Sequence, residues 1–381
     1  MELAYSLNTL YFLLSGVLVM WMAAGFTMLE AGSVRSKNVI EILLKNVALY
    51  SVASLGFLLG GYSLMYGWGD IATHSIYSDF FFQVVFAATA MSVVSGAVAE
   101  RKKLWTFLLF AALFSTFIYP IQGAWSWGGG WLSERGFFDF AGSGIVHMAG
   151  AAAALAGVLI LGPRKGKYLP DGTPRPIHGS NAPLVALGTL ILWMGWFGFN
   201  GGSQLAIDGI VNADAVAKIF VNTNTAAAAG LIAAMILSKL WLGKTALNAT
   251  TNGALAGLVV ITADPLTPSP EIAILYGALG GLLVPLNGKD LVIDLIEELD
   301  CEAVVVSQNY LGSINHTLLT ISVLKERSIP ITGIVFNGDA NKETENIILE
   351  ITGVKCLGRL NQEKEITPSI IAKYATQFKD I

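Results

Sequence analysis

Charged side chains are scarce in this chain of 381 residues: Asp, Glu, Lys and Arg make up 13% of it, against about 25% in soluble domains. Hydrophobic residues make up 54%, and the mean hydropathy is +0.61. The net charge of −4 gives no reason to expect nucleic-acid binding. Cysteine is almost missing too, since Cys301 and Cys356 are the only two. Without metal-ligand spacing, they indicate reducing surroundings and no disulfide framework.

The first apolar run lacks a basic segment before it and an obvious small-residue cleavage site, so we expect a retained span rather than a signal peptide. Composition then changes along the chain. All nine tryptophans lie between Trp21 and Trp241. Residues 288–381 hold 9 Lys+Arg and 14 Asp+Glu, net −5, whereas residues 1–287 hold 14 and 13, net +1. This pattern predicts a membrane domain followed by a soluble acidic tail.

A helix that spans a bilayer needs about 20 mostly apolar residues. Candidate spans are residues 7–31, 42–66, 80–98, 104–121, 143–162, 182–203, 215–241, 252–263 and 271–286. The last two are short, so the sequence predicts an all-α polytopic bundle of about eight or nine spans. Runs of small residues such as 226–230 are typical of closely packed membrane helices.

Basic residues are unevenly distributed among the predicted loops. They follow the first, third, fifth and seventh spans, at Arg35 and Lys37, at residues 101–103, at residues 164–178 and at Lys244. Loops rich in Lys and Arg stay in the cytoplasm. We therefore expect a plasma (inner) membrane protein with its N-terminus outside and its tail in the cytoplasm.

The stretch DFAGSGIVHMAG at 139–150 places a histidine, His147, where the chain has just become apolar. An ionisable ring in a membrane span is costly and indicates a functional site. The alternative is a structural histidine that bonds to a neighbouring helix. His147 alone does not decide between the two.

Six ordered stretches of the first 275 residues together resemble the ammonium transporter family (Amt, methylammonium permease and Rhesus proteins). They are GFTMLEAGSVRSKN at 25–38, GAVAERKK at 96–103, SWGGGWL at 126–132, DFAGSGIVH at 139–147, GWFGFNGGS at 195–203 and FVNTNTAAAAG at 220–230. The resemblance implies an ammonium transporter-like fold for residues 1–275. It also implies a channel that binds ammonium and works as a homotrimer in the lipid bilayer, with no cofactor.

The resemblance assigns roles to particular residues. Trp127, Ser203 and Phe86 would recruit ammonium, Phe86 and Phe199 would form a gate, and Asp139 would hold the recruitment site in shape. An indole face attracts cations. Each residue also has an ordinary interpretation: a belt tryptophan, a helix-terminal serine bonded to backbone, lipid-facing or core phenylalanines, and an N-cap. Trp196 is interpreted as packing.

The mechanism that the resemblance implies has ammonium losing a proton near the gate, and ammonia passing a hydrophobic pore beside histidine nitrogens. That pore holds two histidines, the second on the tenth of eleven spans. This chain has His74, His147, His178 and His316, of which only His147 lies in a predicted span. We therefore expect a truncated membrane domain, and the sequence leaves open whether it conducts.

The tail alternates predicted strands and helices, the pattern of a parallel α/β sheet. Strands are expected at 303–307, 332–336 and 355–360, and helices at 313–326, 342–352 and 368–378. The residues resemble the C-terminal half of dethiobiotin synthetase, an ATP-dependent ligase of biotin synthesis. The matching stretches are GGLLVPLNGKDLVIDLIEEL at 280–299, VVVSQNYLGSINHTLLT at 304–320, TGIVFNG at 332–338 and CLGRL at 356–360.

By that resemblance, Gly312, Ser313, Ile314 and Asn315 would bind a carboxylate at a helix N-terminus, and Asn337 would contact adenine. The alternative is an ordinary turn with Ser313 as helix cap. The sequence holds no G-x-x-x-x-G-K-[ST] phosphate loop, so ATP and magnesium would be cofactors only of a complete domain.

Residues 274–287 fit both patterns, which predicts a chimera of a membrane domain, 1–275, and a partial ligase domain, 276–381. In place of the ligase family's magnesium-binding glutamate this chain has Tyr276. We expect an ammonium channel rather than an enzyme. The alternatives are a ligase fragment or a fusion that does neither.

Overall fold

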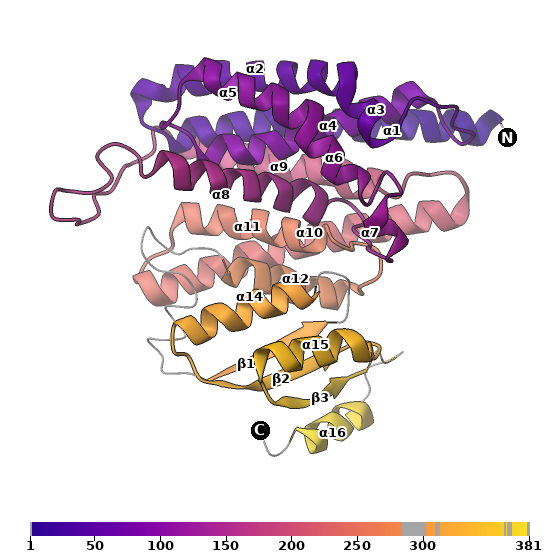
Figure 1. Cartoon of the computed structure of the whole chain (residues 1–381), viewed down its shortest axis with the longest axis vertical. Helices are drawn as coiled ribbons and strands as arrows, with labels where there is room; N and C mark the ends of the chain where they lie inside the picture. The colour runs from indigo at the N-terminus through magenta and orange to yellow at the C-terminus, as the bar shows by residue number, and fades with distance from the viewer. Residues whose placement is uncertain (1, 284–301, 309–312, 362, 364–367, 379–381) are drawn as a thin grey trace. The chain divides into compact units, whose positions relative to one another are not determined.

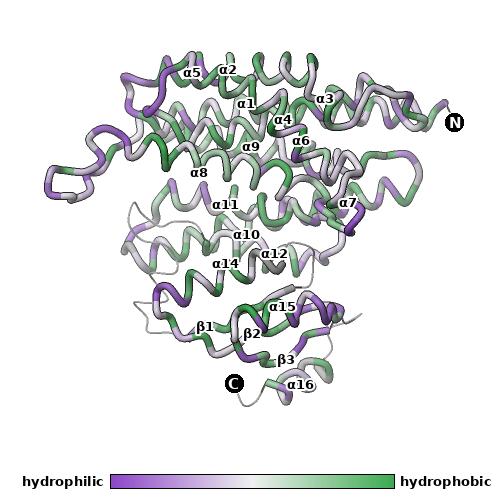
Figure 2. Tube along the Cα trace, in the orientation of Figure 1, coloured by the Kyte–Doolittle hydropathy of each residue, from purple (hydrophilic) through white to green (hydrophobic). Residues whose placement is uncertain are grey.

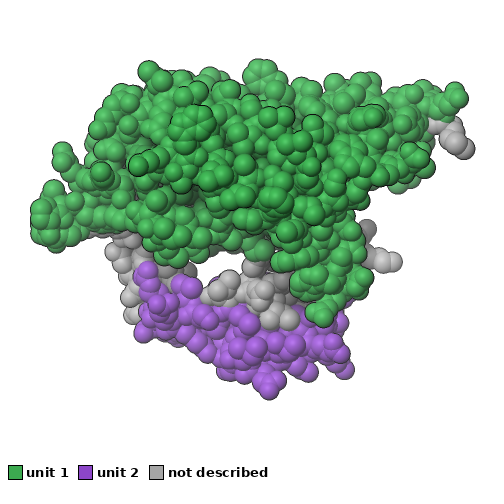
Figure 3. All heavy atoms as spheres, turned by 45° about the horizontal axis from the view of Figure 1, so that its top comes forward, with its two compact units in different colours: residues 1–284 green, residues 285–381 purple. Residues whose placement is uncertain are grey.

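The computed structural model describes residues 2–283, 302–308, 313–361, 363 and 368–378 of the chain. Contacts divide it into two compact units, Met1–Val284 and Pro285–Ile381, which Figure 3 shows in different colours. We call them unit 1 and unit 2 and describe each by itself.

The named secondary-structure elements of unit 1 are all helices, joined by loops (Figure 1). Its elements are α1 (Glu2–Ser33), η1 (Ser36–Asn38), α2 (Val39–Gly56), η2 (Phe57–Gly61), α3 (Tyr62–Met65), α4 (Ile76–Ala97), α5 (Leu104–Leu113), η3 (Phe114–Ile118), α6 (Tyr119–Ala124), α7 (Trp131–Glu134), η4 (Ser143–Met148), α8 (Ala149–Leu161), α9 (Ala182–Gly202), α10 (Gly209–Leu242), α11 (Leu247–Ile261) and α12 (Pro270–Leu282). Helices satisfy every backbone group internally, which hydrocarbon requires. Figure 2 shows hydrophobic residues along most of their length.

Seven helical runs of the described chain are long and apolar enough to cross a membrane. They are Glu2–Ser33, Ser36–Met65, Ile76–Ala97, Leu104–Ala124, Ser143–Leu161, Ala182–Gly202 and Gly209–Trp241. The predicted eighth and ninth spans form helices α11 and α12, but these have only 15 and 13 residues. The expected count of eight or nine spans is therefore not confirmed.

Helix α4 lies at the centre of unit 1, with 72% of its apolar window buried against 28–44% for the other spans. Close helix contacts depend on glycine. A Cβ added to Gly188 of α9 would lie 2.4 Å from the Leu29 nitrogen of α1, and one added to Gly277 of α12 would lie 2.1 Å from the Ala226 oxygen of α10. Because small residues let helix backbones approach, the predicted close packing is observed.

Unit 2 contains a parallel three-stranded sheet in the order β1-β2-β3. Its elements are β1 (Ala303–Gln308), α14 (Ser313–Glu326), β2 (Ile331–Asn337), α15 (Lys342–Thr352), β3 (Cys356–Leu360) and α16 (Pro368–Gln377). Ile334 and Phe336 of β2 pack with Ile321 of α14 and Ile348 of α15. The sequence prediction of a parallel α/β sheet with these strands and helices is confirmed.

Candidate functional site

His147 lies on an irregular helical turn at the start of the fifth span. Element η4 is a π-helix, in which the His147 N–H donates to the Gly142 carbonyl five residues earlier, at 3.0 Å. Gly142 has a φ of 105°, and an added Cβ would lie 2.6 Å from Val146 and 2.9 Å from Trp127. Only glycine fits there. Single π turns are frequent at functional sites because they redirect side chains.

The Asp139 carboxylate caps this turn. Its oxygens accept four backbone N–H groups, from Gly142 and Ser143 at 3.0 Å and from Gly144 and Ile145 at 2.8 Å. Burial raises the pKa of the Asp139 carboxyl above its usual value, and the four donors oppose that shift. The interpretation of Asp139 as a helix cap therefore has direct geometric support.

Asp139 also accepts a hydrogen bond from Trp127. The indole Nε1–H of Trp127 donates to the backbone oxygen of Asp139 at 2.8 Å, and the side chain is half-buried. One end of the ring is thus fixed while the residue stays partly exposed. A fixed, partly dry indole face can attract a cation.

Two phenylalanine rings stack beside Trp127. The centroids of Phe86, from α4, and Phe199, from α9, lie 4.2 Å apart with an interplanar angle of 30°. Phe86 meets Trp127 edge to face, with centroids 6.0 Å apart. Both phenylalanines are at most 1% exposed, so they do not face lipid. The structure therefore brings together rings from sequence positions more than 100 residues apart.

The His147 ring lies next to Phe199, with ring centroids 5.3 Å apart, and the residue is 7% exposed. Its Nδ1 lies 3.1 Å from the Gly142 carbonyl oxygen. A carbonyl only accepts, so Nδ1 carries the proton of the neutral ring and Nε2 carries the lone pair. Nε2 is buried and has no hydrogen-bond partner within the described residues. It can accept a proton or a hydrogen bond.

Trp196 is buried in the core, as its interpretation as a packing residue predicts, and its ring stacks on His147, with centroids 5.2 Å apart and an interplanar angle of 12°. Its Nε1–H donates to the Thr262 hydroxyl at 2.8 Å, and Thr262 lies 3.1 Å from Asn200. Trp196, Phe199 and Asn200 have the i, i+3, i+4 spacing of one helix face. That spacing could have identified Trp196 as a neighbour of the site.

Further rings continue outward from Phe86. Phe82 meets Phe86 at 4.8 Å, Phe12 meets Phe82 at 5.3 Å, and His74 stacks on Phe12 at 4.0 Å. His74 lies in a loop, as predicted, but it is buried, with its Nε2 3.6 Å from Asp79. Sequence reasoning missed these residues because an isolated aromatic in a span carries no local signal.

Ser203 closes α9, one turn after Phe199. Its hydroxyl donates to the Phe199 carbonyl at 2.8 Å, which is the helix-terminal arrangement of the alternative interpretation. The hydroxyl oxygen keeps lone pairs for a further donor.

The residues singled out in the tail lie at the start of α14 and at the end of β2. Ser313, Ile314 and Asn315 form the first turn of α14, and Asn337 ends β2. Gly312, Cys301 and most of the stretch 280–299 lie outside the described residues. In the part of the chain that is described, no cluster of three or more His, Cys, Asp or Glu could hold a metal ion.

Among the described residues, seven helical runs of membrane-spanning length and a buried aromatic pair next to a histidine indicate a multi-pass membrane protein. The chain belongs to the ammonium transporter family, whose model, described as "Ammonium Transporter Family", matches residues 10–353. The ammonium transporter Amt2 of Archaeoglobus fulgidus is 45% identical over 295 residues, 71% of this chain. The match spans 62% of that relative, less than two thirds of its length.

Solved structures agree. One described as "Sensor Amt Protein" has a TM-score of 0.70 and 30% identity, over 99% of this chain and 92% of the other. Candida albicans Mep2 has a TM-score of 0.65 and 28% identity, over 73% of this chain and 65% of the other.

The family model extends past residue 275, so the predicted end of the family resemblance is too early. The family model, the Amt2 relative and the Amt structure give no support to a fused dethiobiotin synthetase domain.

Proposed function

We propose that unit 1 carries ammonium nitrogen across a membrane, with the stacked Phe86–Phe199 pair as a gate and His147 as the proton-handling group below it. The observation that carries the proposal is the buried His147 Nε2, unpartnered within the described chain and next to that pair. A buried imidazole nitrogen without a partner is costly in a purely structural histidine.

In the proposed mechanism, ammonium first meets the Trp127 indole, the Phe86 ring and the Ser203 hydroxyl. Cation–π attraction and a hydrogen bond partly replace its water. The ion then gives a proton to the lone pair of the His147 Nε2 and passes the gate as neutral ammonia, which avoids the cost of moving the ion through hydrocarbon. Potassium has no proton to lose, so the same step excludes it.

His147 then offers Nε2 to the ammonia or to its proton. Of the four histidines of the given sequence, His147 is the one in a helix of membrane-spanning length among the described residues, and we assign this role to its imidazole. The Trp196 ring stacks on that imidazole at an interplanar angle of 12° and supports its orientation. The family resemblance implied a second pore histidine, and the test must therefore ask whether this chain conducts at all.

The experiment is uptake of labelled methylammonium in cells that lack their own ammonium transporters. The chain must first be shown in the membrane fraction. We expect saturable uptake that His147→Ala abolishes and that His178→Ala, in an exposed loop, leaves unchanged. No uptake by membrane-inserted protein would show that family membership is not accompanied by transport here.

We further propose an orientation with the N-terminus outside and the basic loops in the cytoplasm, in a plasma membrane, and a homotrimeric assembly. The basic loops support the orientation. Both cysteines lie after residue 284, so single cysteines placed in unit 1 report sidedness once these two are replaced. Labelling of Trp127→Cys only from the cytoplasmic side would contradict the orientation. Native mass spectrometry measures the number of subunits.

We infer that unit 2 has no ligase activity of its own. The full sequence has no phosphate loop, without which phosphoryl transfer lacks its phosphate-binding lysine. ATP-dependent formation of dethiobiotin by the purified chain would contradict this inference.

A further inference from the structure

A buried asparagine in α1 joins two parts of unit 1 that lie far apart in the sequence. Asn8 is 3% exposed, and its Oδ1 accepts the backbone N–H groups of Ile207 at 2.9 Å and of Asp208 at 3.2 Å. Its Nδ2 donates to the Asp208 carboxylate at 2.9 Å and lies 3.5 Å from the Thr73 carbonyl oxygen. Two N–H donors and one carboxylate acceptor fix the orientation of the amide. Asn8 therefore ties α1 to the segment between α9 and α10.

The Asp208 carboxylate gives up another role to make this contact. Asp208 is the N-cap residue of α10, and an aspartate in that position usually accepts a backbone N–H from the first turn of its helix. Among the described residues, its side chain makes no such cap bond. It accepts from Asn8 instead, and hydrogen bonds to a carboxylate are stronger than those between neutral groups. Capping of α10 therefore does not account for the Asn8–Asp208 pair.

The segment that Asn8 holds, residues 203–208, contains a strained residue. Leu205 has a φ of 61°, in the left-handed region that leucine rarely adopts, and it is 49% exposed. Such a conformation persists only where the surrounding contacts impose it. At the near end of the segment, the backbone N–H groups of Gln204 and Leu205 donate to carbonyls of α9, at 3.0 and 2.9 Å. At the far end the backbone bonds to Asn8, so the path of the segment depends on Asn8.

This segment begins at Ser203, whose hydroxyl is part of the proposed ammonium site. The residue before it, Gly202, packs so closely that an added Cβ would lie 2.5 Å from the Phe82 ring. Packing therefore fixes α9 up to that point. After Ser203 the chain leaves the helix, and the next contact with α1 is the pair of backbone hydrogen bonds to Asn8. The Ser203 oxygen thus lies between a packed helix end and a segment that Asn8 tethers.

The same turn of α1 also holds the start of α4. The Thr9 hydroxyl accepts the backbone N–H of Ser75 at 3.0 Å, and Ser75 is the N-cap residue of α4. Helix α4 carries Phe86, another residue of the proposed ammonium site. Two successive residues of α1 therefore hold the two segments that bring Ser203 and Phe86 together.

We infer that Asn8 is a positioning residue for ammonium binding: it fixes residues 203–208 and so keeps the Ser203 hydroxyl in place for a cation at the Trp127 and Phe86 rings. A binding group must stay within about 0.5 Å of its productive position to be effective. This role rests on the proposed function, which makes Ser203 a ligand of ammonium. Because Asn8 acts through Ser203, its removal cannot weaken binding more than removal of the Ser203 hydroxyl does.

The test measures methylammonium binding to the purified full chain in detergent, as stabilisation against thermal unfolding, so it does not require transport. Asn8→Ala should raise the half-saturating methylammonium concentration about fivefold, and Ser203→Ala about tenfold. In the Ser203→Ala background, Asn8→Ala should add less than about twofold, since coupled residues are not additive. Additive losses would overturn the inference, because Asn8 would then act independently of Ser203.

An exchange of the two partners tests the hydrogen bonds themselves. Asn8→Asp places a carboxylate against that of Asp208 and should weaken binding about tenfold. The double variant N8D/D208N exchanges donor and acceptor, keeps the three hydrogen bonds to the segment and should bind within about twofold of the parent. Asn248→Ala, at an exposed asparagine of α11, is the matched control and should bind as the parent does.

Failure of N8D/D208N to restore binding would overturn the inference, as would a parent that methylammonium does not stabilise. Unfolding without methylammonium identifies a variant that fails to fold, and the exchange variant then decides. The expected couplings without any uptake in cells would refute the proposed transport and support the role of Asn8. Normal uptake with binding that none of the Asn8 variants alters would refute the role of Asn8 alone.

Discussion

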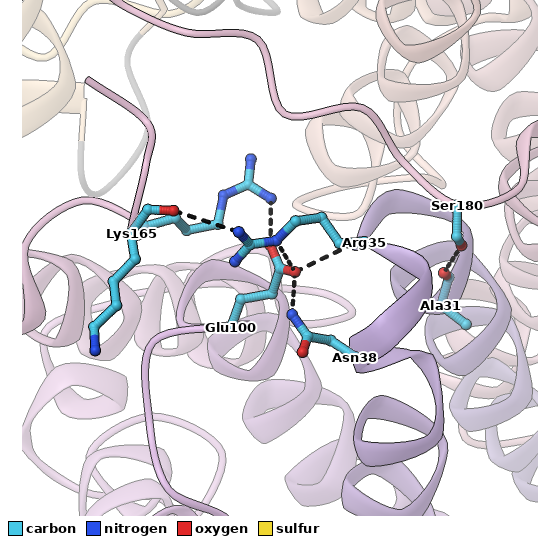
Figure 4. Close-up of polar contacts among 7 residues, drawn as sticks. Ala31, Arg35, Asn38, Glu100, Lys165 and Ser180 are labelled. Atoms are coloured by element: carbon cyan, nitrogen blue, oxygen red, sulfur yellow. Dashed lines mark hydrogen bonds and ion pairs between the residues drawn. The ribbon is translucent and has the colours of Figure 1, made fainter. Parts of the chain in front are cut away.

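Two buried polar side chains near the ends of the helix formed by η4 and α8, His147 and Glu100, differ in how their hydrogen-bonding atoms are satisfied. At the start, His147 keeps a buried nitrogen without a partner among the described residues, and aromatic rings surround it. Beyond the other end, the Glu100 side chain is equally buried, but four donors, two from Arg35 and one each from Asn38 and Arg164, occupy its oxygens (Figure 4). A saturated carboxylate stabilises structure, whereas an unsatisfied buried nitrogen is costly, and this is why we propose a ligand for it.

The largest effect should come from replacing His147, whose Nε2 has no partner among the described residues. His147→Ala should lower methylammonium uptake about 1,000-fold, within the range that a lost proton-transfer group costs. The measurement is initial uptake per membrane-inserted molecule. A residual uptake rate above one tenth of the parent's would mean that transport does not need the His147 Nε2. His147 and Glu100 would then not differ in role.

Replacing Glu100 should instead change the stability of the protein. Glu100→Gln should lower the free energy of unfolding by about 3 kcal/mol, because it weakens charge-assisted hydrogen bonds at a buried site. Glu134→Gln, at an exposed carboxylate of α7, is the matched control and should change little. Thermal unfolding of the detergent-solubilised protein measures both, and uptake at permissive temperature should stay near that of the parent.

Comparison of the parent with Glu100→Gln also tests how the free energy of unfolding depends on pH. Burial opposes ionisation of Glu100, but the hydrogen bonds from Arg35, Asn38 and Arg164 outweigh it and lower the pKa of its carboxyl below 4.5. A lowered carboxyl pKa gives stability that is complete above the unfolded-state pKa and lost as pH falls through the folded one. The difference between parent and Glu100→Gln should therefore be constant above about pH 5 and shrink in more acid solution. A difference that grows on acidification would contradict this assignment.

A smaller effect is expected at Trp127, which is part of the proposed ammonium site and also donates a hydrogen bond to Asp139. Trp127→Phe keeps an aromatic face but removes the N–H that donates to the Asp139 oxygen. Loss of about 1 kcal/mol should raise the half-saturating methylammonium concentration about fivefold, with the maximal rate little changed. Trp131→Phe, at an exposed ring of α7, is the control. A reduced maximal rate with an unchanged half-saturating concentration would place Trp127 in the gating step instead.

The smallest effect should come from the rings that continue from Phe86, namely Phe82, Phe12 and His74, which we call the outer rings. Phe12→Leu removes the contacts of that ring with Phe82 and His74, which are worth about 0.5 kcal/mol or more. Uptake should fall about twofold through looser support of Phe86. Phe117→Leu, at a surface ring, is the comparison. Indistinguishable uptake in these two variants would show that the gate does not depend on the outer rings.

Much of unit 2 was predictable from the sequence. Its β-branched runs separated by helical periods specify strands and helices locally, and helix α14 begins and ends at the predicted residues, 313 and 326. Parallel order follows from the strand–helix alternation. The sequence was misleading on extent, because the family model continues past the expected end of the resemblance at 275.

Within unit 1, apolar run lengths determined the membrane class and the places of the long helices, since hydrocarbon demands about 20 apolar residues per span whatever the packing. The same criterion gave an eighth and a ninth span that the structure does not confirm, because α11 and α12 are apolar but have only 15 and 13 residues.

Only the tertiary structure decided which side chains are in contact. Trp196 stacks on His147, and Phe86 stacks on Phe199. Glu100 forms ion pairs with Arg35 and Arg164. The reason is physical: such contacts depend on how helices distant in sequence approach and rotate, and helical periodicity carries no information on either.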